Sequence, residues 1–300
     1  MTRELGVSMI SPQACKARHA RQRWRTSAFF CVVLLTLPSV TIADDYTLAI
    51  VPQASPAGTY RQWTPFATRL SLLTGEQLQI RVYRTFDEFE ADIVGGRVDF
   101  AYMNPYHLVI SRKEQGYVPL LRDGSRQLSG VLVVRRDSPV KSTQDLNGQD
   151  IGFPDPDAFA ASLYIRALLQ EKEKIRFQPR YFMTHSNVYR HVILGTVAGG
   201  GGVNVTLERE RPEARNELRV LYETPAISPH PLCAHPRIPA DLQQRVIQAV
   251  LGMTEDEDGR AALKLIDIPQ PVRANYVRDY QSLEKLRLSK YRSQKQLPAQ

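Results

Sequence analysis

Cysteine is scarce in this sequence, with three residues in 300. Cys15 and Cys31 fall within the first 43 residues, which leaves Cys233 alone in the rest of the chain. A lone cysteine excludes an intramolecular disulfide there, so the remaining chain must be held together by its apolar core. A segment of that length buries a sizeable core and is long enough for two lobes.

Apolar runs that could span a membrane as a stable helix are also missing. The run over residues 27–40 has the length of the apolar region of a signal peptide, follows a cationic stretch and precedes small residues up to Ala43. We predict a signal peptide over residues 1–43, cleaved after Ala43, with translation beginning at Met1 or Met9. The mature chain is then a periplasmic protein, and an uncleaved membrane anchor is the alternative.

Positive charge is concentrated at the N-terminus. The net charge is +8, but residues 1–43 hold six Lys/Arg and one acidic residue, which leaves about +3 for the remainder. The mature chain therefore has no basic stripe of the kind that nucleic-acid binding needs.

Motifs of catalysis are absent as well. The sequence has no Gly-x-Ser-x-Gly elbow, and no Lys-Ser/Thr follows the four glycines of residues 199–202, which excludes a P-loop. His185 and His191 are six residues apart, which is not the spacing of a metal-binding pair. We predict no catalytic residue, no metal and no cofactor; an exported enzyme that uses a cleft is the disfavoured alternative.

One cluster of soft ligands leaves two interpretations open. His230, Cys233 and His235 lie close together in "HPLCAHP", and on a strand Cys233 and His235 would share a face. A soft-metal or metalloid site is one interpretation, and a buried structural cysteine is the other.

Strands and helices alternate along the first part of the mature chain. We predict strands at 45–52, 78–83 and 97–103, and helices at 60–75, at 85–96 with a capping box from Thr85, and from Asn104-Pro105 onward. Further strands are expected up to residue 224, followed by three amphipathic helices between 238 and 288. This order predicts parallel sheets covered by helices, an α/β fold.

Two groups of such units indicate two lobes. We predict a first lobe over 44–127, a second lobe over 128–228, a return to the first lobe over 229–288 and a flexible tail over 289–300. The chain would cross between the lobes through residues 129–134 and 223–236, the second of which is rich in proline.

Three junctions between a strand and a helix are candidate anion sites: Asn104-Pro105, Ala158–Ser162 and Ser186-Asn187. Ligands of open α/β sheets bind beyond the carboxyl ends of strands, where the N–H groups of helix starts suit an oxyanion. Each junction could equally be a simple turn. The predicted ligand contacts are Tyr60, Tyr102, Asn104, Tyr106, Phe159, Ala160, Ala161, Ser162, His185, Ser186, Asn187, Gly200 and Gly201.

The glycine run "AGGGGVNVT" at 198–206 also leaves two interpretations open. Glycines permit a close approach of the backbone to a ligand or to another segment. A flexible loop is the alternative.

Four motifs carry a resemblance to a known family. They are "WTPF…LS…TG" at 63–75, "GGRVDFAY" at 95–102, "VVRRDSPV…DLNG" at 133–148 and "FPDPD" at 153–157. In this order, over residues 46–265, the chain resembles the phosphate, phosphite and phosphonate periplasmic solute-binding proteins of ABC transporters. The resemblance implies the type II periplasmic binding protein fold, with two lobes, two crossover strands and a ligand clamped between the lobes.

The resemblance breaks at the helix start after "FPDPD". Phosphonate binders of the family have a turn rich in Ser and Thr where this chain has Ala158, Phe159, Ala160 and Ala161. Acidic residues that aminophosphonate binders have at two later positions correspond here to Ser186 and Ala198. A smaller or less charged oxyacid is therefore the expected ligand, rather than an aminoalkylphosphonate.

Two functions follow from the resemblance. The first is a monomeric binding protein that delivers a small oxyanion, such as phosphonate, phosphite or phosphate, to the permease of an ABC importer. The second, suggested by the glycine run and by residues 230–239, is a sensory binding protein of the arsenite-responsive kind, which signals to a membrane histidine kinase.

Overall fold

The computed structural model describes residues 45–286 and 288–292. The predicted signal peptide, its cleavage site, Cys15, Cys31 and the last eight residues lie outside this range. Within it, no helix has both the length and the apolar character that crossing a membrane requires.

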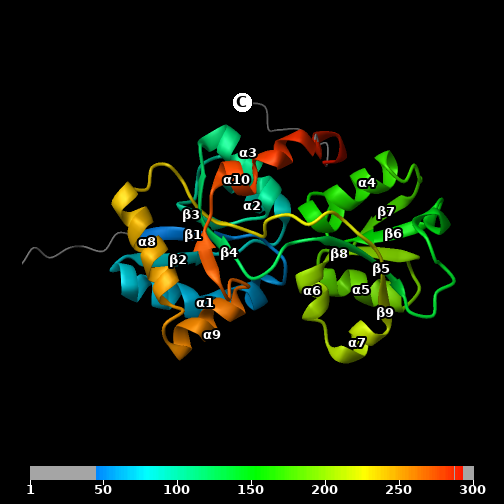
Figure 1. Cartoon of the computed structure of the whole chain (residues 1–300), viewed down its shortest axis with the longest axis horizontal. Helices are drawn as coiled ribbons and strands as arrows, with labels where there is room; N and C mark the ends of the chain where they lie inside the picture. Colours follow the sequence, from blue (N-terminus) through cyan, green and yellow to red (C-terminus); the bar gives the residue numbers. More distant parts are fainter. Residues whose placement is uncertain (1–44, 287, 293–300) are drawn as a thin grey trace, which may run out of the picture. The chain divides into compact units, whose positions relative to one another are not determined.

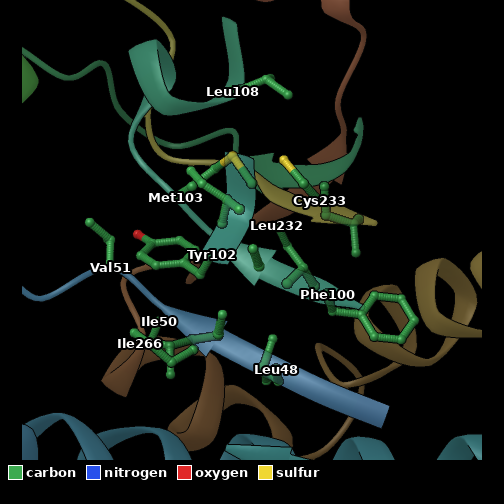
Figure 2. Close-up of a cluster of buried hydrophobic side chains, with 14 of the residues drawn as sticks. Leu48, Ile50, Val51, Phe100, Tyr102, Met103, Leu108, Leu232, Cys233 and Ile266 are labelled. Carbon is green, nitrogen blue, oxygen red and sulfur yellow. The ribbon is translucent and has the colours of Figure 1, made fainter. Parts of the chain in front are cut away.

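The first sheet has six strands in the order β11-β4-β10-β3-β1-β2. β1, β2 and β3 run parallel, β10 is antiparallel to both β3 and β4, and β11 is antiparallel to β4. The strands are β1 (Asp45–Ile50), β2 (Gln77–Arg81), β3 (Phe100–Tyr102), β4 (Val118–Asp123), β10 (Leu232–Ala234) and β11 (Pro271–Arg273). Figure 2 shows part of the core on this sheet, where Leu48 and Ile50 of β1 lie beside Ile266.

Helices cover both faces of the first sheet (Figure 1). They are α1 (Pro56–Thr74), α2 (Phe86–Val94), α3 (Pro105–Gln115), α8 (Ala240–Gly252), α9 (Glu257–Leu265) and α10 (Tyr276–Asp279). The predicted caps are confirmed: the side chains of Thr85 and Asn104 accept hydrogen bonds from the N–H groups of Glu88 and His107, and Gly75 ends α1 at φ 76°. We call this sheet with its helices the first lobe.

The second lobe is built on a five-stranded sheet in the order β7-β6-β8-β5-β9. The strands are β5 (Gly130–Arg135), β6 (Asp150–Phe153), β7 (Gln178–Tyr181), β8 (Gly199–Val203) and β9 (Leu218–Glu223). The helices are α4 (Ile165–Glu171), α5 (His185–Ile193), α6 (Asn204–Glu208), α7 (Pro212–Asn216), the 3₁₀ turn η1 (Thr143–Leu146) and the π-helical segment η2 (Phe159–Tyr164). The predicted α/β fold with two lobes is confirmed.

The chain passes between the lobes twice, over residues 124–129 and 224–231. The two crossings pair at one point, where Leu128 and Ile227 exchange backbone hydrogen bonds of 2.9 and 3.0 Å. Residues 129–134 do not form the first crossing as predicted, because β5 pairs with β8 on one side and β9 on the other.

The prediction of an amphipathic helix over residues 272–288 is wrong. In its place lie β11, α10 and two 3₁₀ segments, η3 (Gln281–Leu286) and η4 (Leu288–Tyr291). Distant partners explain the break: Val272 pairs with Arg122 in the sheet, and the buried Tyr280 hydroxyl donates to the Pro229 carbonyl at 2.9 Å.

The first residues of the predicted flexible tail are held in place instead. The Tyr291 hydroxyl donates to Glu171 of α4 at 2.7 Å, and Arg166 donates to the Tyr291 carbonyl at 2.6 Å. Arg292 forms ion pairs with Glu90 of the first lobe and with Asp157 of the second. The C-terminal segment therefore contacts both lobes.

The glycine run forms the buried strand β8, so its interpretation as a flexible loop is wrong. A Cβ atom on Gly201 would lie 2.2 Å from the Ala161 carbonyl oxygen, and one on Gly202 would lie 2.0 Å from the Tyr189 hydroxyl. The missing side chains let η2 pack on one face of β8 and α5 on the other. The run thus permits a close approach between segments of the chain.

We predict that Gly201→Ala lowers the free energy of unfolding by about 1–3 kcal/mol, because the added methyl group overlaps backbone and ring atoms that cannot both move. Gly252→Ala is the matched control: its Cβ would meet nothing within 4 Å, and alanine favours a helix. Chemical denaturation of both variants checks this. Equal stability of Gly201→Ala and the wild type would contradict the packing described.

Candidate functional site

A cavity of about 340 Å³ is lined by residues of both lobes. The first lobe contributes the segment after β1, the first turns of α1, Tyr102 and the segment after α9. The second lobe contributes the start of α5 and residues 206–211. Its volume is at the small end of the range for ligand pockets and suits a small solute.

Two helix N-termini border this cavity. α1 begins after Ser55, whose hydroxyl accepts from the Gly58 N–H at 3.3 Å, and α5 begins after Thr184, whose hydroxyl accepts from the Asn187 N–H at 3.2 Å. Ala54 and Thr59 of the first start, and His185 and Ser186 of the second, line the cavity. Helix N-termini carry a partial positive charge, so both starts favour an anion between them.

An aromatic wall closes one side of the cavity. The buried Tyr102 ring lies 4.7 Å from the Trp63 ring and is stacked on His230 at 5.4 Å, as measured between centroids. The Gln53 amide nitrogen lies 3.2 Å from Nε2 of His230, so with this amide orientation Nε2 accepts and Nδ1 carries the proton. Figure 2 shows the Tyr102 hydroxyl on the side of Val51, another residue that lines the cavity.

Burial keeps two histidines neutral here. Burial, with a smaller contribution from the charge of Arg209, lowers the pKa of His185 to about 4. The pKa of His230 falls to about 3 because of burial, with contributions from His185 and Arg209. Each ring can therefore donate one hydrogen bond and accept one near neutral pH. Nδ1 of His185 is buried and has no hydrogen-bond partner among the described residues.

The charged side chains that line the cavity are three arginines and two carboxylates: Arg190, Arg209, Arg211, Glu210 and Asp267. Both carboxylates have partners. The Ser186 hydroxyl donates to Glu210, and Asp267 forms an ion pair with Arg209. The lining therefore has one positive charge in excess, which favours an anion.

Three of the predicted ligand contacts line this cavity, namely Tyr102, His185 and Ser186. Tyr60 is 52% exposed and lines a separate hollow between α1 and β2. Asn104 is buried as the cap of α3, and the Asn187 amide donates to the Phe182 carbonyl at 3.0 Å.

The Ala158–Ser162 junction lies in apolar packing between the lobes. Phe159 is stacked between Tyr106 of α3, at 5.7 Å, and Tyr164, at 5.8 Å. Ala160, Ala161 and Ser162 are buried with it, and the Ala161 carbonyl faces Gly201. These positions, with Tyr106, Gly200 and Gly201, are packed against protein atoms, and their role as ligand contacts stays a prediction.

Sequence reasoning missed several residues of the cavity. Ser55-Pro56 has the same pattern as Asn104-Pro105, a capping residue followed by proline, and would have placed the start of α1 at the site. Arg209 and Asp267 gave no such signal. Arg209 lies in a run of charged residues that is typical of a solvated surface, and Asp267 follows an ordinary amphipathic helix.

The metalloid interpretation of "HPLCAHP" finds no support in the geometry. Cys233 is fully buried in β10, where burial raises the pKa of its thiol. Figure 2 shows it on the side of the strand that faces Met103 and Leu108, and His235 packs edge-on against Tyr117 instead. No group of three or more His, Cys, Asp or Glu side chains among the described residues is placed to hold a metal ion.

One protein family matches most of the chain. Residues 48–280 match the model of a family described as the periplasmic substrate-binding protein of the phosphonate ABC transporter.

Solved structures match the fold over most of their length. The binding-protein component of a phosphonate ABC transporter from Pseudomonas aeruginosa is 15% identical, with a TM-score of 0.73 over 82% of this chain and 86% of that one. A Prochlorococcus marinus protein in complex with methylphosphonate is 12% identical, with a TM-score of 0.72 over 81% and 96%. A Xanthomonas citri protein bound to chloride ion is 17% identical, with a TM-score of 0.70 over 82% and 98%.

The unpartnered Nδ1 of His185 generates a stability prediction. Because a buried polar atom without a partner costs free energy, we expect His185→Leu to keep the free energy of unfolding or raise it by about 1 kcal/mol. Tyr189→Phe is the control, since it removes a buried hydroxyl that lies 3.0 Å from Thr206 Oγ1 and should cost about 1 kcal/mol. Urea denaturation compares the two. A large loss in His185→Leu would mean that the ring serves folding rather than the cavity.

The lowered pKa of His185 predicts acid sensitivity. The unfolded chain binds this proton near pH 6.5 and the folded chain only near pH 4, so stability is complete above pH 6.5 and is lost as the pH falls. We expect the wild type to lose about 1.4 kcal/mol per pH unit more than His185→Leu between about pH 6 and pH 4.5. Parallel pH profiles for the two proteins would refute this.

Proposed function

We infer that this chain, which belongs to the family of periplasmic substrate-binding proteins of phosphonate ABC transporters, binds a small oxyanion in the cavity between its two lobes. The membership confirms the family resemblance seen in the four motifs. It also places the chain among proteins that bind a substrate for a transporter, not among enzymes.

One observation carries the choice of an oxyanion. The cavity combines two helix N-termini, the neutral ring of His185, one excess positive charge and carboxylates that already have partners. An oxyanion can accept hydrogen bonds from the helix N–H groups, from His185 and from a guanidinium. The ammonium group of an aminoalkylphosphonate would need a carboxylate without a partner, which this lining does not offer.

Small size and low charge are the further properties that we propose for the ligand. A cavity of about 340 Å³ walled by Trp63 and Tyr102 has room for phosphite, phosphate or methylphosphonate. The similarity to a protein in complex with methylphosphonate supports this class. We propose Tyr102, His185, Ser186 and Arg209 as the side chains that contact the ligand.

The ligand-bound protein would deliver its oxyanion to the permease of an ABC importer. Periplasmic location follows from the family, and we propose that residues 1–43 direct export. Closure of the lobes around the ligand would produce the form that docks, with the chain acting as a monomer. Signalling to a membrane histidine kinase remains the alternative proposal, which uses the same cavity and differs only in the partner.

A thermal-shift panel tests the binding proposal. We expect phosphite, phosphate or methylphosphonate to raise the melting temperature, since a ligand at 100 times its Kd adds about 2.7 kcal/mol of stability. A neutral amide serves as the control of similar size without an oxyanion function. If no member of a panel that includes sulfate, arsenite, arsenate and molybdate shifts the melting temperature, the oxyanion proposal fails.

A further inference from the structure

One ion pair joins the two lobes inside the cavity. Arg209 follows α6 in the second lobe, Asp267 follows α9 in the first, and their guanidinium and carboxylate groups form a salt bridge. Both side chains line the proposed ligand cavity. An anionic ligand in the cavity would therefore have to compete with Asp267 for the guanidinium group of Arg209.

Asp267 is held firmly on the first lobe. Its backbone has a φ of 64°, in the left-handed region, which aspartate adopts more readily than most residues other than glycine. The neighbours Ile266 and Ile268 are both buried, and Figure 2 shows Ile266 in the core beside Ile50. The packing of these two neighbours fixes the position of Asp267 on the first lobe. The carboxylate, 17% exposed, is thereby presented to the cavity rather than to bulk solvent.

Arg209 is held firmly on the second lobe. Its N–H donates to the Val205 carbonyl at 3.3 Å at the end of α6. Its guanidinium has five N–H donors, more than one carboxylate can use, so it can bind Asp267 and a ligand oxygen together. The titratable or charged groups around it are Tyr102, Arg126, His185, Arg190, Glu210, Arg211, His230 and Asp267.

We propose that Arg209 is the cation that recognises the ligand, and that Asp267, by neutralising most of its charge, restricts the cavity to monoanions. This inference rests on the proposed oxyanion function and goes further by naming the charge state of the substrate. The lining has one positive charge in excess while Asp267 is ionised. A monoanion matches that excess, whereas the second charge of a dianion would lie uncompensated beside Asp267 and Glu210.

Ligand titration across pH tests the proposal, with methylphosphonate as the probe in isothermal calorimetry from about pH 5.5 to pH 8.5. If only its monoanion binds, the apparent Kd rises about tenfold per pH unit once the second proton is lost. Hypophosphite, a monoanion over the whole range, should bind independently of pH. Sulfate, a dianion throughout, should bind at least about tenfold more weakly than hypophosphite.

Asp267→Asn should reverse the preference for monoanions over dianions. Removing one carboxylate leaves two positive charges in excess, so sulfate should bind roughly tenfold to a hundredfold more tightly than to the wild type, and the pH dependence for methylphosphonate should flatten. Glu208→Gln is the matched control, because it removes the same charge next to Arg209 from a residue that pairs with Arg126 at 3.2 Å. We expect it to change each Kd by less than about threefold.

Arg209 variants test the other half of the pair. Arg209→Gln should weaken the binding of every anion at least about tenfold, and Arg209→Lys should restore part of the lost affinity. Melting temperatures without ligand confirm that each variant is folded.

The outcomes separate this inference from the proposed function. If the wild type binds oxyanions but discriminates neither by charge nor through Arg209 and Asp267, this inference is overturned and the proposed function stands. If neither the wild type nor Asp267→Asn binds any probe, both are overturned.

Discussion

The close approach of η2 and α5 to the two faces of β8 is the constraint on which the site depends. Only glycine at positions 200–202 leaves room for Val188, the Ala161 carbonyl and the Tyr189 hydroxyl at the distances observed. Because α5 packs directly on β8, its first residues, His185 and Ser186, are fixed at the edge of the second lobe. The same strand runs into α6, and Arg209 directly follows this helix. A strand whose first four residues are glycine thus positions three of the residues that line the cavity.

The contacts between the lobes are apolar in one place and polar in another. Phe159, Tyr106 and Tyr164 form a continuous apolar contact between the lobes. At the cavity, two helix starts, the neutral His185 and paired charges meet. Burial removes the charge of His185 and His230 and leaves their hydrogen-bonding capacity. In the proposed account, Arg209 and its partner Asp267 therefore determine which anion binds. Under this proposal, helix dipoles and a balanced set of charges would select the ligand.

The parts of the fold that could be predicted are those set by neighbours in the sequence. Thr85, Asn104 and Gly75 mark helix ends through contacts within a few residues, and each was located correctly. Tyr102, His185 and Ser186 line the cavity, as expected for residues that lie at or beyond the carboxyl ends of strands. The segment 272–288 was misjudged because Val272 pairs with Arg122, far away in the sequence. Phe159–Ser162 has the pattern of an open helix start, and only the contact with β8 shows that it is packed inside. Arg209 and Asp267 could not be predicted because their ion pair joins residues that are far apart in the sequence.

Anomalous diffraction from crystals soaked with selenite tests the central claim most directly, because selenium marks the position of a bound oxyanion. The account predicts a selenium peak in the cavity between the starts of α1 and α5, within hydrogen-bonding distance of His185 and Arg209. A well-occupied peak at Ala160–Ser162, or on the outer surface of either lobe with the cavity empty, would contradict it.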